Sequence, residues 1–182
     1  MDFNILLSQY ETGERDFVGV NLHKANLREV DLSGANFCGA DLSGADLSQA
    51  NLSGCNFSRA NLTDADLTRT DLNGANLSEI NLIGADLINA NLEGTNLSRA
   101  DLRGANLVRA NLTKANLSEA ELSGADLSGA NLNQANLIET NLNEAELNGV
   151  NITGATITER EMSGVIMHTG LSHKWITWAG GC

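Results

Sequence analysis

A five-residue period runs through most of the chain and restricts the folds that are open to it. Between Ala100 and Leu137, Ala recurs at every fifth position, Leu follows two residues after each Ala, and Asn, Asp or Glu stands between them. On an α-helix, five residues advance about 140° beyond a full turn, so the leucines would spiral around the helix. On a straight strand, an odd spacing would place successive leucines on opposite faces. The chain can keep its leucines on one side only by turning a corner in each pentad.

Repeated corners of one hand would close the chain into stacked coils, a β-solenoid filled by Ala and Leu. Spacings of twenty residues indicate that four pentads make one coil: Phe17, Phe37 and Phe57 are twenty apart, and Ala occupies every twentieth position from 25 to 145. The other small inward positions admit Val20, Cys55, Thr70, Ile80 and Thr95. We expect about seven coils that each rise by ~4.8 Å and together form a rod roughly 35 Å long.

The pattern A-[N/D]-L-x-x resembles the pentapeptide-repeat family. It covers 29 consecutive pentads from Arg15 to Glu159, with Leu at the centre of 24, Phe of three and Ile of two. The resemblance implies an all-β fold, a right-handed quadrilateral parallel β-helix with four pentads per coil. The family includes many cyanobacterial proteins, some of which act in regulation, and proteins that bind DNA gyrase and confer quinolone resistance. The positions expected to form the core include Phe17, Phe37, Phe57, Leu107 and Leu127.

The chain divides into an N-terminal segment (1–14), the repeats (15–159) and a C-terminal tail (160–182). In the first segment, Phe3, Leu6, Leu7 and Tyr10 are spaced i, i+3, i+4, i+7, which predicts a short amphipathic helix that Asp2 can cap and Gly13 can end. A solenoid end exposes unpaired backbone and apolar interior, so we expect this helix to cover the first coil.

The register of the repeats fails after Ile157, because Arg160 would occupy an inward Ala position and bury an unpaired charge. The tail contains both tryptophans of the chain, Trp175 and Trp178. Two roles are open for them. They can pack on the last coil as a cap, which we prefer, or they can form the contact of an end-to-end dimer, as in the gyrase-binding members that dimerise through their C-termini. The sequence therefore leaves open a monomer or a C-terminal dimer.

Composition excludes several classes of partner. A formal net charge of −12 argues against direct nucleic-acid binding and against binding to acidic membranes, since both require basic surfaces. The N-terminus has no basic region followed by a long apolar run, and no segment approaches transmembrane length. Three cysteines do not make a disulfide framework, so we expect free thiols in a reducing cytoplasm.

No motif in the sequence indicates catalysis. There is no phosphate-binding loop, nucleophile elbow or zinc spacing, and the spacing of His168, His173 and Cys182 matches no standard metal site. A filled rod is also expected to lack a concave pocket. We therefore expect neither an enzyme nor a cofactor.

Two sets of outward residues are candidate interaction sites. One column is mainly acidic and contains Asp46, Asp66, Asp86 and Asp126, with Arg69 and Arg109 in the next column of the same side. It is either a solvated face or a recognition stripe for a basic partner. The second role is considered because like charges stacked over one another are unfavourable without a compensating charge. Apolar residues also break the polar pattern at Ile83, Ile88, Val108 and Ile138, and the first three are the candidate contact. They are either scattered substitutions or an apolar contact site.

These features favour a non-enzymatic interaction rod, a scaffold or regulator that binds an unknown protein partner. An alternative is an acidic DNA mimic that binds DNA gyrase. Duplex DNA carries one charge per ~1.7 Å, whereas this rod carries about one net charge per 3 Å, diluted by eleven Lys and Arg. A third reading, a serine ladder that binds ice or sugar, rests on Ser58, Ser78, Ser98 and Ser118. These serines occupy the ordinary position after the leucine, so this reading ranks last.

Overall fold

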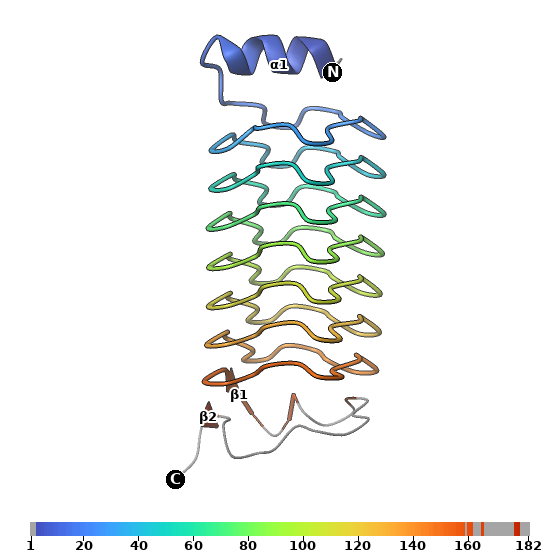
Figure 1. Cartoon of the computed structure of the whole chain (residues 1–182), viewed down its shortest axis with the longest axis vertical. Helices are drawn as coiled ribbons and strands as arrows, with labels where there is room; N and C mark the ends of the chain where they lie inside the picture. The colour runs from blue at the N-terminus through green and yellow to red at the C-terminus, as the bar shows by residue number, and fades with distance from the viewer. Residues whose placement is uncertain (1–2, 159, 162–164, 166–176, 179–182) are drawn as a thin grey trace.

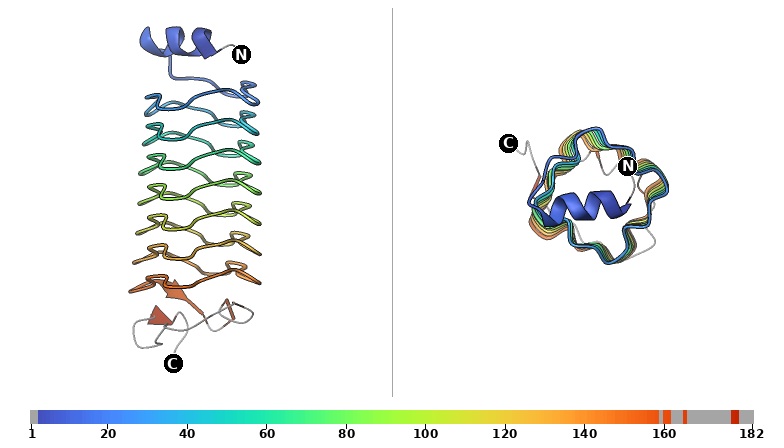
Figure 2. Two further views of the ribbon diagram at one scale, coloured as in Figure 1. Left: turned by 45° about the vertical axis from the view of Figure 1, so that its right-hand side comes forward. Right: turned by 90° about the horizontal axis from the view of Figure 1, so that it is seen from above.

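The computed structural model describes residues 3–158, 160–161, 165 and 177–178. Helix α1 (Phe3–Glu11) lies across one end of a column of stacked coils, and the short strands β1 (Thr156–Ile157) and β2 (Thr177–Trp178) lie at the other end (Figure 1). Viewed along the rod, successive coils lie nearly over one another (Figure 2). The described part of the chain is therefore a solenoid with a helix at its N-terminal end.

Each coil is joined to the next by a parallel ladder with a register of twenty residues. The bridges begin at Asp16↔Asn36 and continue to Asn136↔Thr156. Leu107 donates its N–H to the carbonyl of Asp126 at 2.7 Å, and Asp126 donates to the carbonyl of Ala105 at 3.0 Å. The twenty-residue pitch that the Phe and Ala spacings predicted is confirmed, and each coil contains four pentads.

The corner in each pentad is a hydrogen-bonded turn. In one of them the N–H of Ala110 donates to the carbonyl of Leu107 at 2.9 Å, and Arg109, the third residue of the turn, has a φ of 56°. A positive φ at this place is characteristic of a type II turn, and Gly adopts it without steric cost, as Gly104 does in the preceding turn. The turns leave too few residues for continuous strands. Between positions 16 and 155 the ladder therefore consists of single bridges rather than the extended strands of an ordinary β-sheet.

The Asn or Asp before each leucine fixes the start of the turn. Its side-chain oxygen accepts the N–H two residues further on, as Asn106 does from Val108 at 3.2 Å. Asparagines also link the coils, because the side-chain amide of each one donates to the side chain twenty residues earlier. This ladder starts at Asp16, which accepts from Asn36, and continues through Asn56, Asn76, Asn96, Asn116 and Asn136. The link between this residue and the turn was found only in the structure.

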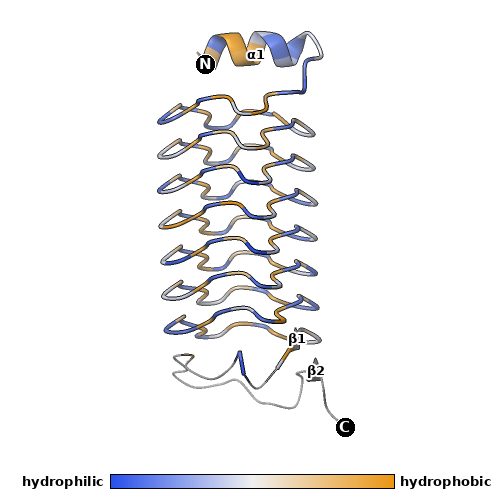
Figure 3. Cartoon of the chain, turned by 180° about the vertical axis from the view of Figure 1, so that it is seen from behind, coloured by the Kyte–Doolittle hydropathy of each residue, from blue (hydrophilic) through white to orange (hydrophobic). Residues whose placement is uncertain are grey.

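The interior is filled by the inward residues, and polar and apolar positions alternate along the coils (Figure 3). Leu107 and Leu127 are fully buried. Phe17, Phe37 and Phe57 are stacked, with ring centroids 5.4 and 5.1 Å apart. The polar inward groups are satisfied by carbonyls, since Thr70 donates to Leu47 at 2.8 Å and Cys55 to Leu32 at 3.1 Å. Burial raises the pKa of the Cys55 thiol to about 11.

Helix α1 packs on the first coil through the predicted residues. Leu6 is fully buried, and Phe3, Leu7 and Tyr10 are partly buried against the same core. The hydroxyl of Tyr10 donates to the carbonyl of Ser33 at 2.9 Å. Gly13, with a φ of 100°, follows the helix as expected, whereas Asp2 lies outside the described residues.

The ladder continues beyond the repeats into the tail. Strand β2 pairs in parallel with β1, Thr156 with Thr177 and Ile157 with Trp178, a register of 21 rather than twenty residues. As the failing register predicted, Arg160 is exposed. The carboxylate of Glu161 is buried instead, and it accepts the N–H of Glu139 at 2.9 Å and that of Thr158 at 2.6 Å. Burial raises the pKa of Glu161, but these hydrogen bonds outweigh it and lower the pKa overall.

Candidate interaction surface

Three outward columns, each with one residue per coil, lie side by side along the rod. The acidic column consists of Asn26, Asp46, Asp66, Asp86, Asn106, Asp126 and Glu146. The central column consists of Arg28, Ser48, Thr68, Ile88, Val108, Ser128 and Asn148. The outer column consists of Glu29, Gln49, Arg69, Asn89, Arg109, Gly129 and Gly149.

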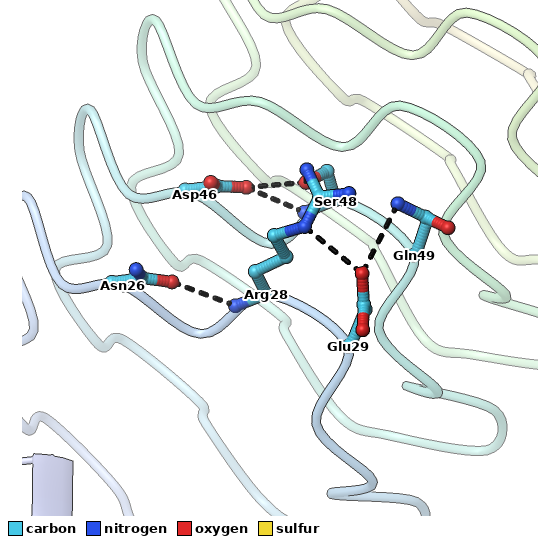
Figure 4. Close-up of polar contacts among 6 residues, drawn as sticks. All are labelled: Asn26, Arg28, Glu29, Asp46, Ser48 and Gln49. Atoms are coloured by element: carbon cyan, nitrogen blue, oxygen red, sulfur yellow. Dashed lines mark hydrogen bonds and ion pairs between the residues drawn. The ribbon is translucent and has the colours of Figure 1, made fainter.

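Side-chain contacts join the three columns into one continuous surface, as Figure 4 shows for its N-terminal end. Ser48 Oγ donates to Asp46 Oδ1 at 2.6 Å and lies 3.3 Å from Arg28 Nη1, which donates to it. Arg28 Nε in turn donates to Glu29 Oε1 at 3.0 Å, and Gln49 donates to the same oxygen at 3.5 Å. At this end of the rod, the three columns therefore form one connected surface.

Carboxylates stand directly over one another in the acidic column. Asp46 bridges Asp66 and Asp66 bridges Asp86 through the backbone, which stacks three like charges at the inter-coil spacing of ~4.8 Å. Local donors hold these carboxylates in place: Thr68 N–H donates to Asp66 at 2.9 Å, and the Ser48 hydroxyl donates to Asp46, which is the largest cause of the lowered pKa of Asp46. Ser128 N–H donates in the same way to Asp126 at 2.8 Å.

The aspartates of the acidic column form no ion pair within the described part of the chain, although the charge of Arg28 adds to the Ser48 hydrogen bonds in lowering the pKa of Asp46. Among the described residues the ion pairs are Arg28–Glu29, Arg59–Glu79, Arg99–Glu119 and Arg103–Asp101. None of them includes an aspartate of the acidic column. By contrast, the corner with Arg59, Glu79, Arg99 and Glu119 alternates in charge, and its Arg and Glu pair with each other from coil to coil. The acidic column therefore keeps three consecutive aspartates, Asp46, Asp66 and Asp86, outside these ion pairs.

The apolar residues Ile88 and Val108 belong to the central column in consecutive coils, where Asn89 N–H donates to the carbonyl of Val108 at 3.0 Å. Ile83 lies at the preceding corner of the coil. All three side chains are half-buried, because the adjoining coils cover part of each. The large hydrophobic residues that are mostly exposed in the described part of the chain are Ile5 (53%) and Val18 (55%), and the sequence singled out neither.

One cluster with a resemblance to catalytic groups was missed in the sequence. His23 Nδ1 lies 2.8 Å from Ser43 Oγ, and Ser43 Oγ donates to Asp41 Oδ1 at 2.7 Å. In a hydrolytic triad the histidine stands between the hydroxyl and the carboxylate, so that it can take the proton of the nucleophile. Here the serine stands in the middle and donates its proton to the acid, so the histidine is not placed to take that proton.

A pocket of about 590 Å³ forms where the repeats end, lined by Glu119, Glu121, Glu139, Arg160 and Glu161 among others. The expectation that the rod would lack a concave pocket is wrong at this end. The reason is that the pentad register stops at Arg160, so the next coil no longer continues the corner. The described residues of the lining include four glutamates and Thr140 but no cysteine, serine or histidine.

The part of the chain that the structure describes contains no group of three or more His, Cys, Asp or Glu that could hold a metal ion. Within that part, no helix has the length and apolar character needed to cross a membrane. His168, His173, Cys182 and Trp175 lie outside the described residues, and the side chain of Trp178 is not described.

Comparison with solved structures shows the fold. A trypsin-treated variant of QnrB1, a plasmid-mediated fluoroquinolone resistance protein, matches at 20% identity over 91% of both chains with a TM-score of 0.55. HetL of Nostoc, a pentapeptide repeat protein involved in heterocyst differentiation regulation, matches at 31% identity over 95% of this chain and 100% of its own, with a TM-score of 0.30. Rfr23 of Cyanothece matches at 33% identity over 85% of this chain and 98% of its own, with a TM-score of 0.36.

No curated protein matches the chain in sequence. The family model for pentapeptide repeats matches in eight copies, over residues 16–54, 40–79, 80–119 and 120–158. Together with the twenty-residue parallel ladder, these matches identify the solenoid as a right-handed β-helix. The chain belongs to the pentapeptide-repeat family.

Proposed function

We propose that this chain is a non-enzymatic protein–protein interaction rod, four-sided and about seven coils long, which acts as a scaffold or regulator. The observation that carries the proposal is the surface of three columns. It combines stacked aspartates that lack ion pairs in the described chain with the apolar pair Ile88 and Val108. Charge left unpaired beside apolar surface is the combination that a protein partner can use.

The backbone makes this surface rigid before a partner arrives. Every coil is bonded to its neighbours, and backbone N–H groups of the turns hold the carboxylates of the acidic column, as the N–H of Thr68 holds Asp66. A surface that is ordered in advance loses little conformational entropy on binding. The expected partner presents basic groups to Asp46, Asp66 and Asp86 and an apolar side chain to Ile88 and Val108.

The ends of the chain are proposed to protect this rod rather than to bind the partner. Support for an N-terminal cap (1–14) comes from buried Leu6 and from the bond between Tyr10 and Ser33. Support for a C-terminal cap (160–182) comes from the pairing of β2 with β1 and from buried Glu161. Trp175 and Trp178 belong to this tail; an end-to-end dimer through them is the alternative. Free Cys38 and Cys55 suit a reducing cytoplasm.

Replacing Ile88 with Lys is expected to remove partner binding without unfolding the rod. The change puts a hydrated cation into the apolar centre of the surface, while the side chain is outward and only half-buried. The measurement is affinity capture from a lysate of the source cells followed by mass spectrometry, with the thermal midpoint of the variant measured in parallel. We expect at least about a tenfold loss of the captured partner and an unchanged midpoint.

Ile138→Lys is the matched control, because Ile138 is also an outward, half-buried isoleucine but lies at a different corner of the coil. It should retain the partner. Recovery of the same partner at wild-type strength on Ile88→Lys would exclude this surface.

A DNA mimic that binds DNA gyrase is the second candidate, and the stack of Asp46, Asp66 and Asp86 favours it. Three consecutive carboxylates at ~4.8 Å are nevertheless more widely spaced than the phosphate charges of a duplex, which lie one per ~1.7 Å of its axis. The same side of the rod also carries Arg69 and Arg109, whose sign is wrong for a mimic. The interaction rod is therefore the better supported function.

A further inference from the structure

The order of charges across the three-column surface restricts how it can meet a partner. Along each coil the chain passes first through the acidic column, then the central column and then the outer column. The contacts from Asp46 through Ser48 and Arg28 to Glu29 follow the same order. The outer column carries Arg69 and Arg109, together with the amides Gln49 and Asn89. At the levels of Asp46, Asp66 and Asp86, one flank therefore presents carboxylates and the other presents donors, whereas the outer column has Glu29 at one end and Gly129 and Gly149 at the other.

We propose that this surface binds a second copy of the chain, so that two rods lie side by side and parallel. A two-fold axis that runs along the rod over the central column places the acidic column of each copy opposite the outer column of the other. An axis across the rod would instead place acidic column against acidic column, which like charges disfavour. This inference rests on the proposed function, since it names the partner of the same surface.

In the parallel arrangement, three consecutive levels place an aspartate opposite a donor, whereas Asp126 and Glu146 lie opposite Gly129 and Gly149. An axis along the rod keeps each residue at its own level, so Gln49 faces Asp46, Arg69 faces Asp66 and Asn89 faces Asp86 of the other copy. Each of these aspartates thereby meets a donor. At the levels of Glu29 and Arg109 the opposite residue is an uncharged amide, Asn26 or Asn106. No level brings a residue of the acidic column against a like charge of the outer column.

The central column faces itself in this dimer. Ile88 and Val108 meet their own copies and bury apolar surface, and Ser48, Thr68 and Ser128 are small enough to let the rods approach. Arg28 also faces its own copy, but Glu29 lies 3.0 Å from it and compensates its charge.

The spacing of the charges also favours a second copy. The carboxylates repeat at the inter-coil distance of ~4.8 Å, whereas alternate residues of one extended strand repeat at roughly 6.6 Å. Another rod with the same pitch keeps its donors level with Asp46, Asp66 and Asp86 without accumulating a mismatch along the rod. A strip of about seven coils is narrow compared with a standard interface of ~800 Å² per partner, so the dimer should be weak and concentration-dependent.

Charge exchange between two positions tests the proposal on the intact chain. Asp66→Lys alone places Lys opposite Arg69, and Arg69→Glu alone places Glu opposite Asp66, each twice per dimer because of the symmetry. Either change should weaken dimerisation at least about tenfold. An equimolar mixture of the two variants should restore it, because each copy then offers the charge that the other requires. Glu144→Lys, the same charge change at another corner, is the control and should leave dimerisation unchanged.

Sedimentation of the purified chain at rising concentration measures the dimer, and two differently tagged variants report the mixed one. Dimerisation that is lost in both single variants, recovered in their mixture and weakened by salt supports the proposal. A chain that stays monomeric at about 1 mM overturns the proposal. A dimer that persists in the Asp66→Lys variant also overturns it, because an end-to-end dimer would give that result. The proposed function fails separately, only if capture with the Ile88→Lys variant still yields the wild-type partner.

Discussion

Replacement of Leu107 by Asp is expected to unfold the rod or to remove most of its stability. Leu107 is fully buried in a middle coil, so the new carboxylate would be surrounded by the Leu and Ala side chains of the core. Burying an unpaired charge costs more than the ~5–15 kcal/mol by which a domain is stable, unless the structure opens to water. Because each coil is stabilised only by its neighbours, a break there should propagate in both directions.

Val108→Ser is the matched control for that experiment. Val108 is the next residue, but its side chain points outward and is half-buried, so its loss should cost within about 1 kcal/mol. Chemical denaturation followed by circular dichroism measures both variants. Equal destabilisation by the two changes would contradict the assignment of inward and outward positions.

Phe37→Ala is expected to cost about 3–5 kcal/mol, the second largest effect. Phe37 is the middle ring of the stack, 5.4 Å from Phe17 and 5.1 Å from Phe57, so its removal leaves a cavity and loses both ring contacts. Phe37→Leu should cost much less, below about 1.5 kcal/mol, because Leu77 occupies the same column two coils later. Thermal and urea unfolding measure both changes. If Leu were as costly as Ala at this position, the columns would not be equivalent from coil to coil.

The repeat made the interior predictable from the sequence. A period of five that admits Ala and Leu at fixed positions determines which side chains face inward, and the Phe and Ala columns determine the pitch. Where the repeat ends, the prediction ends as well. Glu161 was not recognised as a buried residue, because its burial depends on the backbone N–H groups of Glu139 and Thr158 that the last coil leaves without a partner coil.

The surface was less predictable than the core for a physical reason. Outward positions tolerate many residues. A hydrophobic residue at such a position is visible in the sequence, but the exposed fraction of its side chain depends on the neighbouring coils. Ile88 and Val108 were identified as apolar outliers and are half-buried, whereas Ile5 and Val18, which are more exposed, lie outside the regular middle of the rod. The cluster of His23, Ser43 and Asp41 requires residues of two coils to meet, and no local motif indicates it.

DNA supercoiling by purified gyrase, titrated with this chain, separates the two candidate functions most directly. The interaction rod predicts no inhibition and no drug protection up to about tens of micromolar protein, since its charge is too sparse to replace a duplex. Inhibition at micromolar concentration would contradict the account, above all if salt and the double change Asp66→Asn with Asp86→Asn weakened it. Asn keeps the side-chain oxygen that the turn needs, so such a loss would report the charge of the acidic column and not the fold.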